Sequence, residues 1–160
     1  MDTLIEAARI AGLPLHIAGA TTSQSNKHRE VVWRGLLDAS ALSEFYRGAR
    51  LVVTPSRWNE AFGLVPAEAM MHGVPVIASR IGALPELVEH GVTGLLFEAG
   101  NVAALANCIT TLWNDPARCT QMGLVARERM LALCSASSYC DRVLAVYERA
   151  AAYRPFRQSM

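Results

Sequence analysis

One stretch limits the fold more than any other part of the chain: residues 54–79, TPSRWNEAFGLVPAEAMMHGVPVIAS. It reads as the end of a strand, a loop, a short helix, a tight turn and the next strand, which together make one α/β unit. Pro66 is expected at the first helical position, where its fixed φ fits and its missing N–H is not needed. Val65 is then the N-cap, and Glu68 lies in the first turn, where the helix dipole favours a carboxylate.

The same unit predicts a place for an anion. Gly73 is expected just after the C-cap of the helix, and Val74–Ala78 is expected to be a buried strand that begins with a tolerated proline. Glu60 lies on the loop ahead of the helix, whose N-terminus carries partial positive charge. The pattern therefore predicts an anion site at a loop-to-helix junction, with Glu60 and Glu68 beside it.

Helices and strands alternate along the rest of the chain. The expected strands are Leu15–Ala18, Glu30–Arg34, Arg50–Thr54 and Gly94–Phe97, and Thr21–Arg29 is expected to be polar and turn-like. The expected helices are Asp2–Ala11, Ala39–Gly48, Pro85 to Gly91, one capped by Asn101, one from Pro116 to about Leu133 after the cap Asp115, and about Ser137–Ala152. Alternation of this kind indicates a parallel sheet with right-handed crossovers, flanked by helices.

Composition excludes several classes of protein. The chain has 160 residues, 52% of them hydrophobic and 18% charged, which fits one folded domain and not a disordered segment. Its net charge of +1 argues against a nucleic-acid partner, and no apolar run reaches membrane-spanning length. The four cysteines, Cys108, Cys119, Cys134 and Cys140, match no zinc spacing, so we expect free thiols in a cytoplasmic protein.

The segment Glu60–Glu68, EAFGLVPAE, resembles the E-x7-E signature of the family 4 retaining glycosyltransferases, which have the GT-B fold. The spacing alone is common by chance, but its context is specific. The segments PS at 55–56, EAM at 68–70, GVPVIAS at 73–79, LPE at 84–86 and GVTGLL at 91–96 surround it in the order of the family. The similarity extends from Leu4 to about Met130. It departs at Ala61 and Ala83, where the family usually has glycine.

The resemblance implies a Rossmann-like parallel sheet, the C-terminal half of a GT-B enzyme, which binds a UDP- or GDP-linked sugar without a metal or another cofactor. It implies that Glu68 accepts hydrogen bonds from the ribose hydroxyls. It also implies that Glu60, as the catalytic residue, contacts the donor sugar and steadies the charge that develops on its ring. The backbone N–H groups expected to face the sugar and phosphate are those of Phe62, Gly63, Leu64 and Val65.

The chain opens on a helix, whereas a doubly wound domain opens on a strand. The resemblance implies that residues 1–160 form a single domain without that first strand, the Arg and Lys that follow it, and the acceptor-binding domain. Leu15–Ala18 and Leu51–Thr54 would then have free inner edges, which either pair directly or recruit a second copy. We expect this chain alone to bind nucleotide weakly and to transfer no sugar, with a position at the membrane surface left open for a full-length enzyme.

Several residues have competing interpretations. Arg57 and Arg80 could assist a diphosphate, although exposed surface arginines are commoner. His72 and His90 each precede a glycine expected to end a helix, which favours a role as caps. Trp58 either stacks on the base or buries the loop.

The function also has alternatives. The acceptor is a hydroxyl of a glycan, a lipid or a small molecule, and the sequence does not distinguish them. The rival class is a non-catalytic remnant or an interaction module of the same fold, and a sugar-nucleotide epimerase is a third. A hydrolase with Ser56 as nucleophile is rejected, because no elbow motif surrounds this residue.

Overall fold

All the strands that pair in the computed structural model do so in parallel, as the alternating pattern predicts. The structure describes residues 1–20 and 31–153, and the predicted turn-like segment Thr21–Arg29 lies outside them. In chain order the elements are α1 (Asp2–Ala11), β1 (Leu15–Ala18), β2 (Val31–Gly35), α2 (Ala39–Arg47), β3 (Val52–Thr54), α3 (Leu64–Met71), β4 (Val76–Ser79), α4 (Leu84–Leu87), β5 (Gly94–Phe97), α5 (Val102–Trp113), α6 (Pro116–Cys134) and α7 (Ala136–Ala152).

The strands form two separate sheets. β1 pairs with β2, and β4 lies between β3 and β5. Within the described residues no ladder joins β1 to β3, so the direct pairing considered above is not formed. All four residues of β4 are buried, whereas Val52 and Val53 of β3 are only half-buried on opposite faces. The inner edge of β3 is therefore open.

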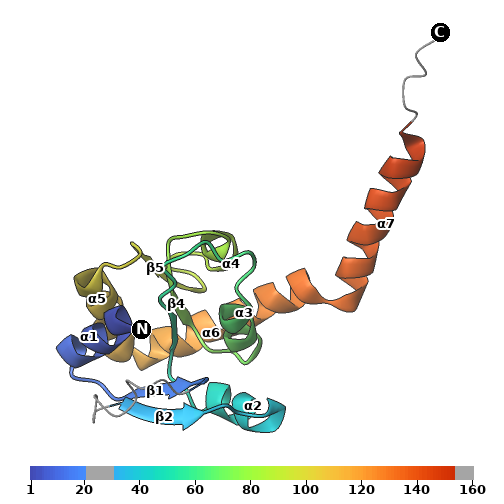
Figure 1. Cartoon of the computed structure of the whole chain (residues 1–160). Helices are drawn as coiled ribbons and strands as arrows, with labels where there is room; N and C mark the ends of the chain where they lie inside the picture. The colour runs from blue at the N-terminus through green and yellow to red at the C-terminus, as the bar shows by residue number, and fades with distance from the viewer. Residues whose placement is uncertain (21–30, 154–160) are drawn as a thin grey trace.

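Helices cover both faces of the three-stranded sheet. Successive residues of β4 point to opposite sides of the sheet and pack against different helices. Val76 and Ala78 pack with Met70 of α3, while Ile77 packs with Leu4 of α1 and residues of α5. α1 and α5 lie side by side in Figure 1. The site described below therefore lies on the α3 side of the sheet.

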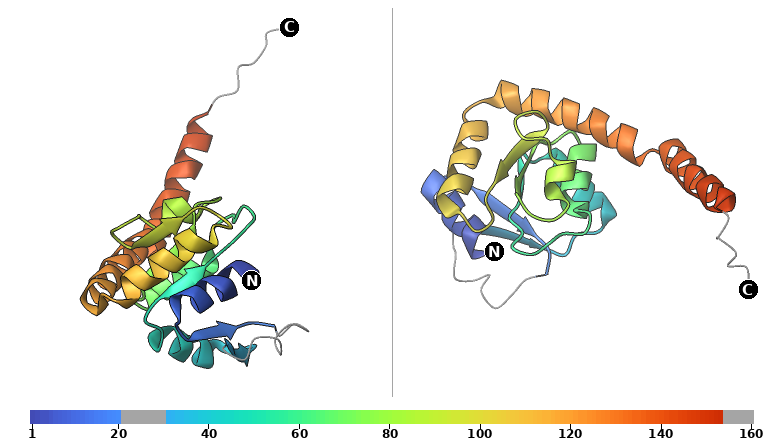
Figure 2. Two further views of the ribbon diagram at one scale, coloured as in Figure 1. Left: turned by 90° about the vertical axis from the view of Figure 1, so that its left-hand side faces the viewer. Right: turned by 90° about the horizontal axis from the view of Figure 1, so that it is seen from above.

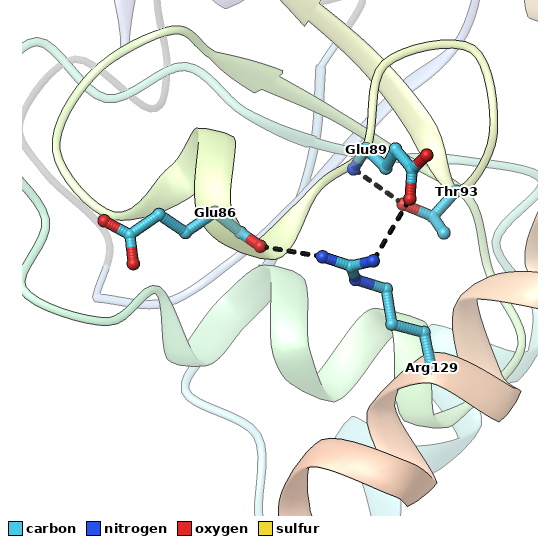
Figure 3. A network of polar contacts seen from close by, with 4 residues as sticks. All are labelled: Glu86, Glu89, Thr93 and Arg129. Carbon is cyan, nitrogen blue, oxygen red and sulfur yellow. Dashed lines mark hydrogen bonds and ion pairs between the residues drawn. The ribbon is translucent and has the colours of Figure 1, made fainter.

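Two contacts fix α6 against this α/β unit. A Cβ atom at Gly123 would collide with the carbonyl oxygen of Gly73. The backbone of α6 therefore lies in direct contact with the backbone of the turn between α3 and β4. Arg129 donates from Nη1 to Glu89 Oε2 and from Nη2 to the Glu86 carbonyl, both at 3.1 Å (Figure 3). The Glu89 N–H donates to Thr93 Oγ1, which closes the network. These bonds hold the segment after α4 to α6.

The sequence predicts the helix ends correctly where a side chain caps the helix. Asn101 and Asp115 each accept a hydrogen bond from a backbone N–H three residues on, as predicted, and Gly12 ends α1 in the left-handed conformation. The predicted start of β4 at Val74 is wrong, because the Val74 N–H still bonds the Ala69 carbonyl in the turn. Likewise α4 is a single turn that ends at Leu87, not at Gly91.

α7 leaves the body of the molecule and has no buried residue (Figures 1 and 2). Tyr139, Leu144, Val146 and Tyr147 are each more than half exposed along it. Among the described residues, no helix has both the length and the apolar character that crossing a bilayer requires.

Candidate functional site

The helix of the site begins two residues earlier than predicted. Gly63 is the N-cap of α3, with a φ of +90° that glycine adopts without strain, and Val65 lies inside the first turn. Pro66 is accommodated at the third helical position, because the first N–H groups of a helix have no intrahelical acceptor. The predicted N-cap at Val65 is therefore wrong, and Glu68 lies in the second turn and not the first.

Gly63 is required by packing. A Cβ atom there would lie 2.8 Å from Leu84 Cδ2 and 3.1 Å from Pro66 Cγ, so the start of α3 is in close contact with α4. The neighbouring side chains of Phe62, Leu64 and Val65 are exposed. In the part of the chain that the structure describes, the backbone N–H groups of residues 62–65 donate to no protein acceptor. The junction thus presents unpaired donors at an accessible helix N-terminus.

Glu60 is held from two sides. Ser56 Oγ donates to Glu60 Oε1 at 2.6 Å, and the Ser56 side chain is buried, with its residue 8% exposed. The Ala83 N–H donates to the Glu60 carbonyl at 2.9 Å. A Cβ atom at Gly82 would lie 2.6 Å from both the backbone N and O of Glu60. The loop after β4 therefore fixes the backbone of Glu60, and Ser56 orients its carboxylate.

Glu68 is held by α2. Tyr46, 4% exposed, donates from its hydroxyl to Glu68 Oε2 at 2.9 Å. Burial, together with the hydrogen-bonded carboxylate, raises the pKa of Tyr46 above its ordinary value. The phenol therefore stays protonated and acts as a donor at physiological pH.

His72 is the C-cap of α3, as predicted, and is followed by Gly73 with a φ of +75°. Its Nδ1 lies 2.8 Å from the Glu68 carbonyl oxygen, and its Nε2 lies 2.9 Å from Ser43 Oγ on α2. His90 does not cap a helix, which corrects the prediction. Its Nδ1 accepts from the Leu96 N–H at 3.0 Å, so His90 is bonded to the third residue of β5.

The structure places the remaining candidate residues in different environments. Arg80 pairs with Glu98 at 3.3 Å on the surface, while Arg57 makes no ion pair with any described residue. Trp58 is 70% exposed, which rules out the interpretation that it buries the loop. Ala83 has a right-handed helical backbone (φ −77°), and no described non-glycine residue has positive φ, so the backbone conformation at Ala61 and Ala83 does not require glycine.

The cysteines are free thiols, as predicted. Cys119 is buried and donates to the Leu112 carbonyl, and burial raises the pKa of its thiol. Among the described residues, no three His, Cys, Asp or Glu side chains come together in a way that could hold a metal ion. The absence of a metal from the reaction remains a prediction.

The sequence predicts Glu60 and Glu68 as site residues but does not predict the hydroxyls that bind them. For Ser56 a signal existed, since it precedes Glu60 by four residues on the same loop. For Tyr46 no local signal exists, because its bond to Glu68 spans 22 residues and joins two helices.

Residues 1–115 match the family model described as glycosyl transferases group 1. The chain belongs to this family. Among its relatives is D-inositol 3-phosphate glycosyltransferase 1 of Catenulispora acidiphila, 43% identical over 109 residues, which cover 68% of this chain and 26% of that protein. The chain spans about a quarter or less of the length of the curated relatives it matches first.

Solved structures confirm the GT-B type of α/β fold. Sucrose-phosphate synthase from Thermosynechococcus elongatus is 32% identical with a TM-score of 0.79, and the similarity covers 94% of this chain and 42% of that one. TarM of S. aureus, in a complex that contains UDP, is 26% identical with a TM-score of 0.78, and the similarity covers 91% of this chain and 32% of that one. The expected C-terminal glycosyltransferase domain is thus confirmed.

Proposed function

We propose that this chain binds the nucleotide-sugar donor for a retaining, metal-independent glycosyltransferase. One observation carries the proposal: two carboxylates, Glu60 and Glu68, flank the N-terminus of α3, and a buried hydroxyl orients each of them. Between them, the N–H groups of residues 62–65 lack protein acceptors within the described residues. The free N–H groups can bind a diphosphate, and the carboxylates on either side can accept hydrogen bonds from the hydroxyls of the ribose and of the sugar.

Each group has a separate role in this proposal. Glu68 accepts hydrogen bonds from the ribose hydroxyls, and Glu60 accepts them from the donor sugar. The N–H groups of Phe62, Gly63, Leu64 and Val65 face the sugar and phosphate, where they stabilise the negative charge of the departing nucleoside diphosphate. Trp58 is exposed on the same loop and is available to stack on the base.

UDP is the first nucleotide to test, since the TarM complex contains it. The acceptor would be a hydroxyl of a glycan, a lipid or a small molecule, bound by a part of a longer enzyme outside these 160 residues. The second candidate is a nucleotide-sugar-binding or interaction module without turnover.

The deciding experiment compares UDP binding by the chain and by Glu68→Ala, using NMR titration with isotope-labelled protein and millimolar nucleotide. Loss of a carboxylate acceptor should weaken binding by about 1–3 kcal/mol. Glu148→Ala on the exposed helix α7 is the matched control and should leave the affinity unchanged. Equal affinities of Glu68→Ala and the parent chain would refute the ribose-binding role.

A further inference from the structure

Tyr46 and Glu68 come from different helices and meet at a boundary between core and solvent. Tyr46 lies near the end of α2 and is 4% exposed, whereas Glu68 lies in the second turn of α3 and is exposed. An exposed glutamate samples several rotamers unless a partner selects one. Here the buried phenol hydroxyl is that partner, through the 2.9 Å bond to Oε2.

The ring that carries this hydroxyl is itself fixed. The centroid of the Tyr46 ring lies 5.3 Å from the centroid of the His72 ring. The Phe45 ring packs edge-on against Tyr46, with a centroid distance of 6.3 Å. Ser43 of α2 lies within hydrogen-bonding distance of His72 Nε2, which ties the same two helices together a second time. Tyr46 therefore has little freedom to follow a moving carboxylate, and the carboxylate must adopt the geometry that the phenol sets.

The hydrogen bond from Tyr46 leaves specific acceptor sites free on the Glu68 carboxylate. An ionised carboxylate has two oxygens with about four acceptor sites in total, and the phenol occupies one of them on Oε2. The described residues donate nothing to Oε1. We infer that Tyr46 is a positioning residue that fixes Glu68 so that Oε1 receives a ribose hydroxyl. This inference rests on the proposed function, because it names how the ribose part of that site is oriented.

A purely structural role for Tyr46 makes a different prediction. Tyr46 belongs to the buried cluster that also contains residues of α3 and β4, so a loss of packing would weaken binding of every nucleotide alike. A positioning role acts on the ribose hydroxyls alone. The informative quantity is therefore the ratio of the Kd for 2′-deoxy-UDP to the Kd for UDP, which cancels any general loss of affinity.

The experiment measures this ratio by NMR titration for the parent chain, Tyr46→Phe, Glu68→Ala and the double variant. A hydrogen bond to a charged group corresponds to a preference of about tenfold or more for UDP in the parent chain. Tyr46→Phe keeps the ring and removes the hydroxyl, and should lower the preference to about two- to threefold. Glu68→Ala should abolish it, and Tyr46→Phe should then change nothing further. Tyr147→Phe on exposed α7 is the matched control.

Glu68→Gln supplies a second test that leaves Tyr46 intact, in case the phenylalanine variant does not fold. If the phenol sets the geometry, the amide oxygen accepts from Tyr46 and the amide nitrogen faces the ribose, where it can only donate to the oxygen of the hydroxyl. A neutral hydrogen bond then replaces the bond to the carboxylate, so the preference for UDP should fall to about two- to threefold. A preference as large as that of the parent chain would overturn the inference.

The remaining outcomes separate the two proposals. If Glu68→Ala abolishes the preference for UDP while Tyr46→Phe retains it, the positioning role is wrong and the ribose-binding role stands. An equal loss of affinity for both nucleotides in Tyr46→Phe also reduces Tyr46 to a packing residue. If the parent chain shows no preference, or Glu68→Ala keeps it, the ribose-binding role fails and the inference fails with it.

Discussion

Ser56 donates a 2.6 Å hydrogen bond to Oε1 of Glu60, four residues further along the same loop. The donor is buried while the acceptor is only half-buried, so this pair repeats the relation between Tyr46 and Glu68. In both pairs a rigid hydroxyl inside the protein holds one oxygen of a carboxylate near the surface. The two carboxylates are therefore already oriented, which would lower the entropy lost if they bind the proposed donor.

Ser56→Ala should affect binding of the sugar more than binding of the nucleotide. Without the hydroxyl, the Glu60 carboxylate loses its orientation, so UDP-glucose should bind more weakly by about 1 kcal/mol, while UDP alone binds as before. Glu60→Gln should give the same pattern with a larger loss. NMR titration with both ligands measures the difference, and Ser137→Ala at the start of α7 serves as the control. Equal losses for UDP and UDP-glucose would mean that this pair holds the nucleotide or only the loop.

Gly82→Ala should destabilise the fold through the backbone of Glu60. The added Cβ would lie 2.6 Å from Glu60 N and O, which are backbone atoms that cannot turn aside. Gly82 also has a φ of +57°, so part of any loss comes from strain in an L-residue. Gly35→Ala separates the two causes, because Gly35 has a similar φ of +67° and nothing within 4 Å of its added Cβ.

We expect Gly82→Ala to lower the free energy of unfolding by about 1–3 kcal/mol more than Gly35→Ala, measured by urea denaturation. UDP-glucose binding should also fall in Gly82→Ala, because the Glu60 loop must shift. If the two alanine variants are equally stable, the loop after β4 does not clamp Glu60.

The sequence predicted the parts of the fold that depend on neighbours along the chain. Gly94–Phe97 is a strand as predicted, and the caps at Asn101 and Asp115 form because each side chain reaches an N–H three residues away. The error at Val65 has a tertiary cause. Gly63 caps α3, and its missing side chain also leaves room for Leu84, a contact 21 residues away that no local pattern contains.

The same division applies to the site. Glu60 and Glu68 were found through their spacing and context, whereas the hydroxyl of Tyr46 reaches Glu68 only after α2 packs on α3. The glycine after His90 predicts that His90 is a cap, but α4 ends at Leu87, three residues before His90. The motif and its context predict Glu60 and Glu68 as site residues, and tertiary contacts decide how their side chains are held.

The open edge of β3 should be visible in amide hydrogen exchange. The Val52 N–H donates to the Pro75 carbonyl next to β4, so the Val53 N–H points the other way, to the edge where no strand pairs within the described residues. Val53 should therefore exchange much faster than Val52, and faster than Ile77 in the central strand β4. At low protein concentration NMR can resolve these three amides.

The concentration dependence of this exchange separates the alternatives for the free edges. If Val53 becomes protected only as the protein concentration rises, a second copy covers the edge, as we expect for an apolar strand without charged or proline residues. Protection at every concentration would instead mean that the edge is already closed within one chain, which would contradict the topology of the two sheets.

The stability of the chain should fall at alkaline pH because of Tyr46. Burial and the Glu68 carboxylate raise the pKa of this phenol in the folded state above the ordinary value near 10. Below that value both states keep the proton, so the stabilisation is fully present. Above it the unfolded chain ionises first, and stability declines as pH rises toward the pKa of the folded state, by at most about 1.4 kcal/mol per pH unit for one proton.

Tyr46→Phe should remove this part of the decline, so its free energy of unfolding should fall less steeply between pH 9 and pH 11 than that of the parent chain. Urea denaturation at several pH values measures both slopes. The other tyrosines of the described residues, Tyr139, Tyr147 and Tyr153, are exposed, so Tyr147→Phe should keep the slope of the parent chain. Parallel curves for Tyr46→Phe and the parent chain would show that the Tyr46–Glu68 bond does not depend on the proton of the phenol, and would contradict its role as the donor.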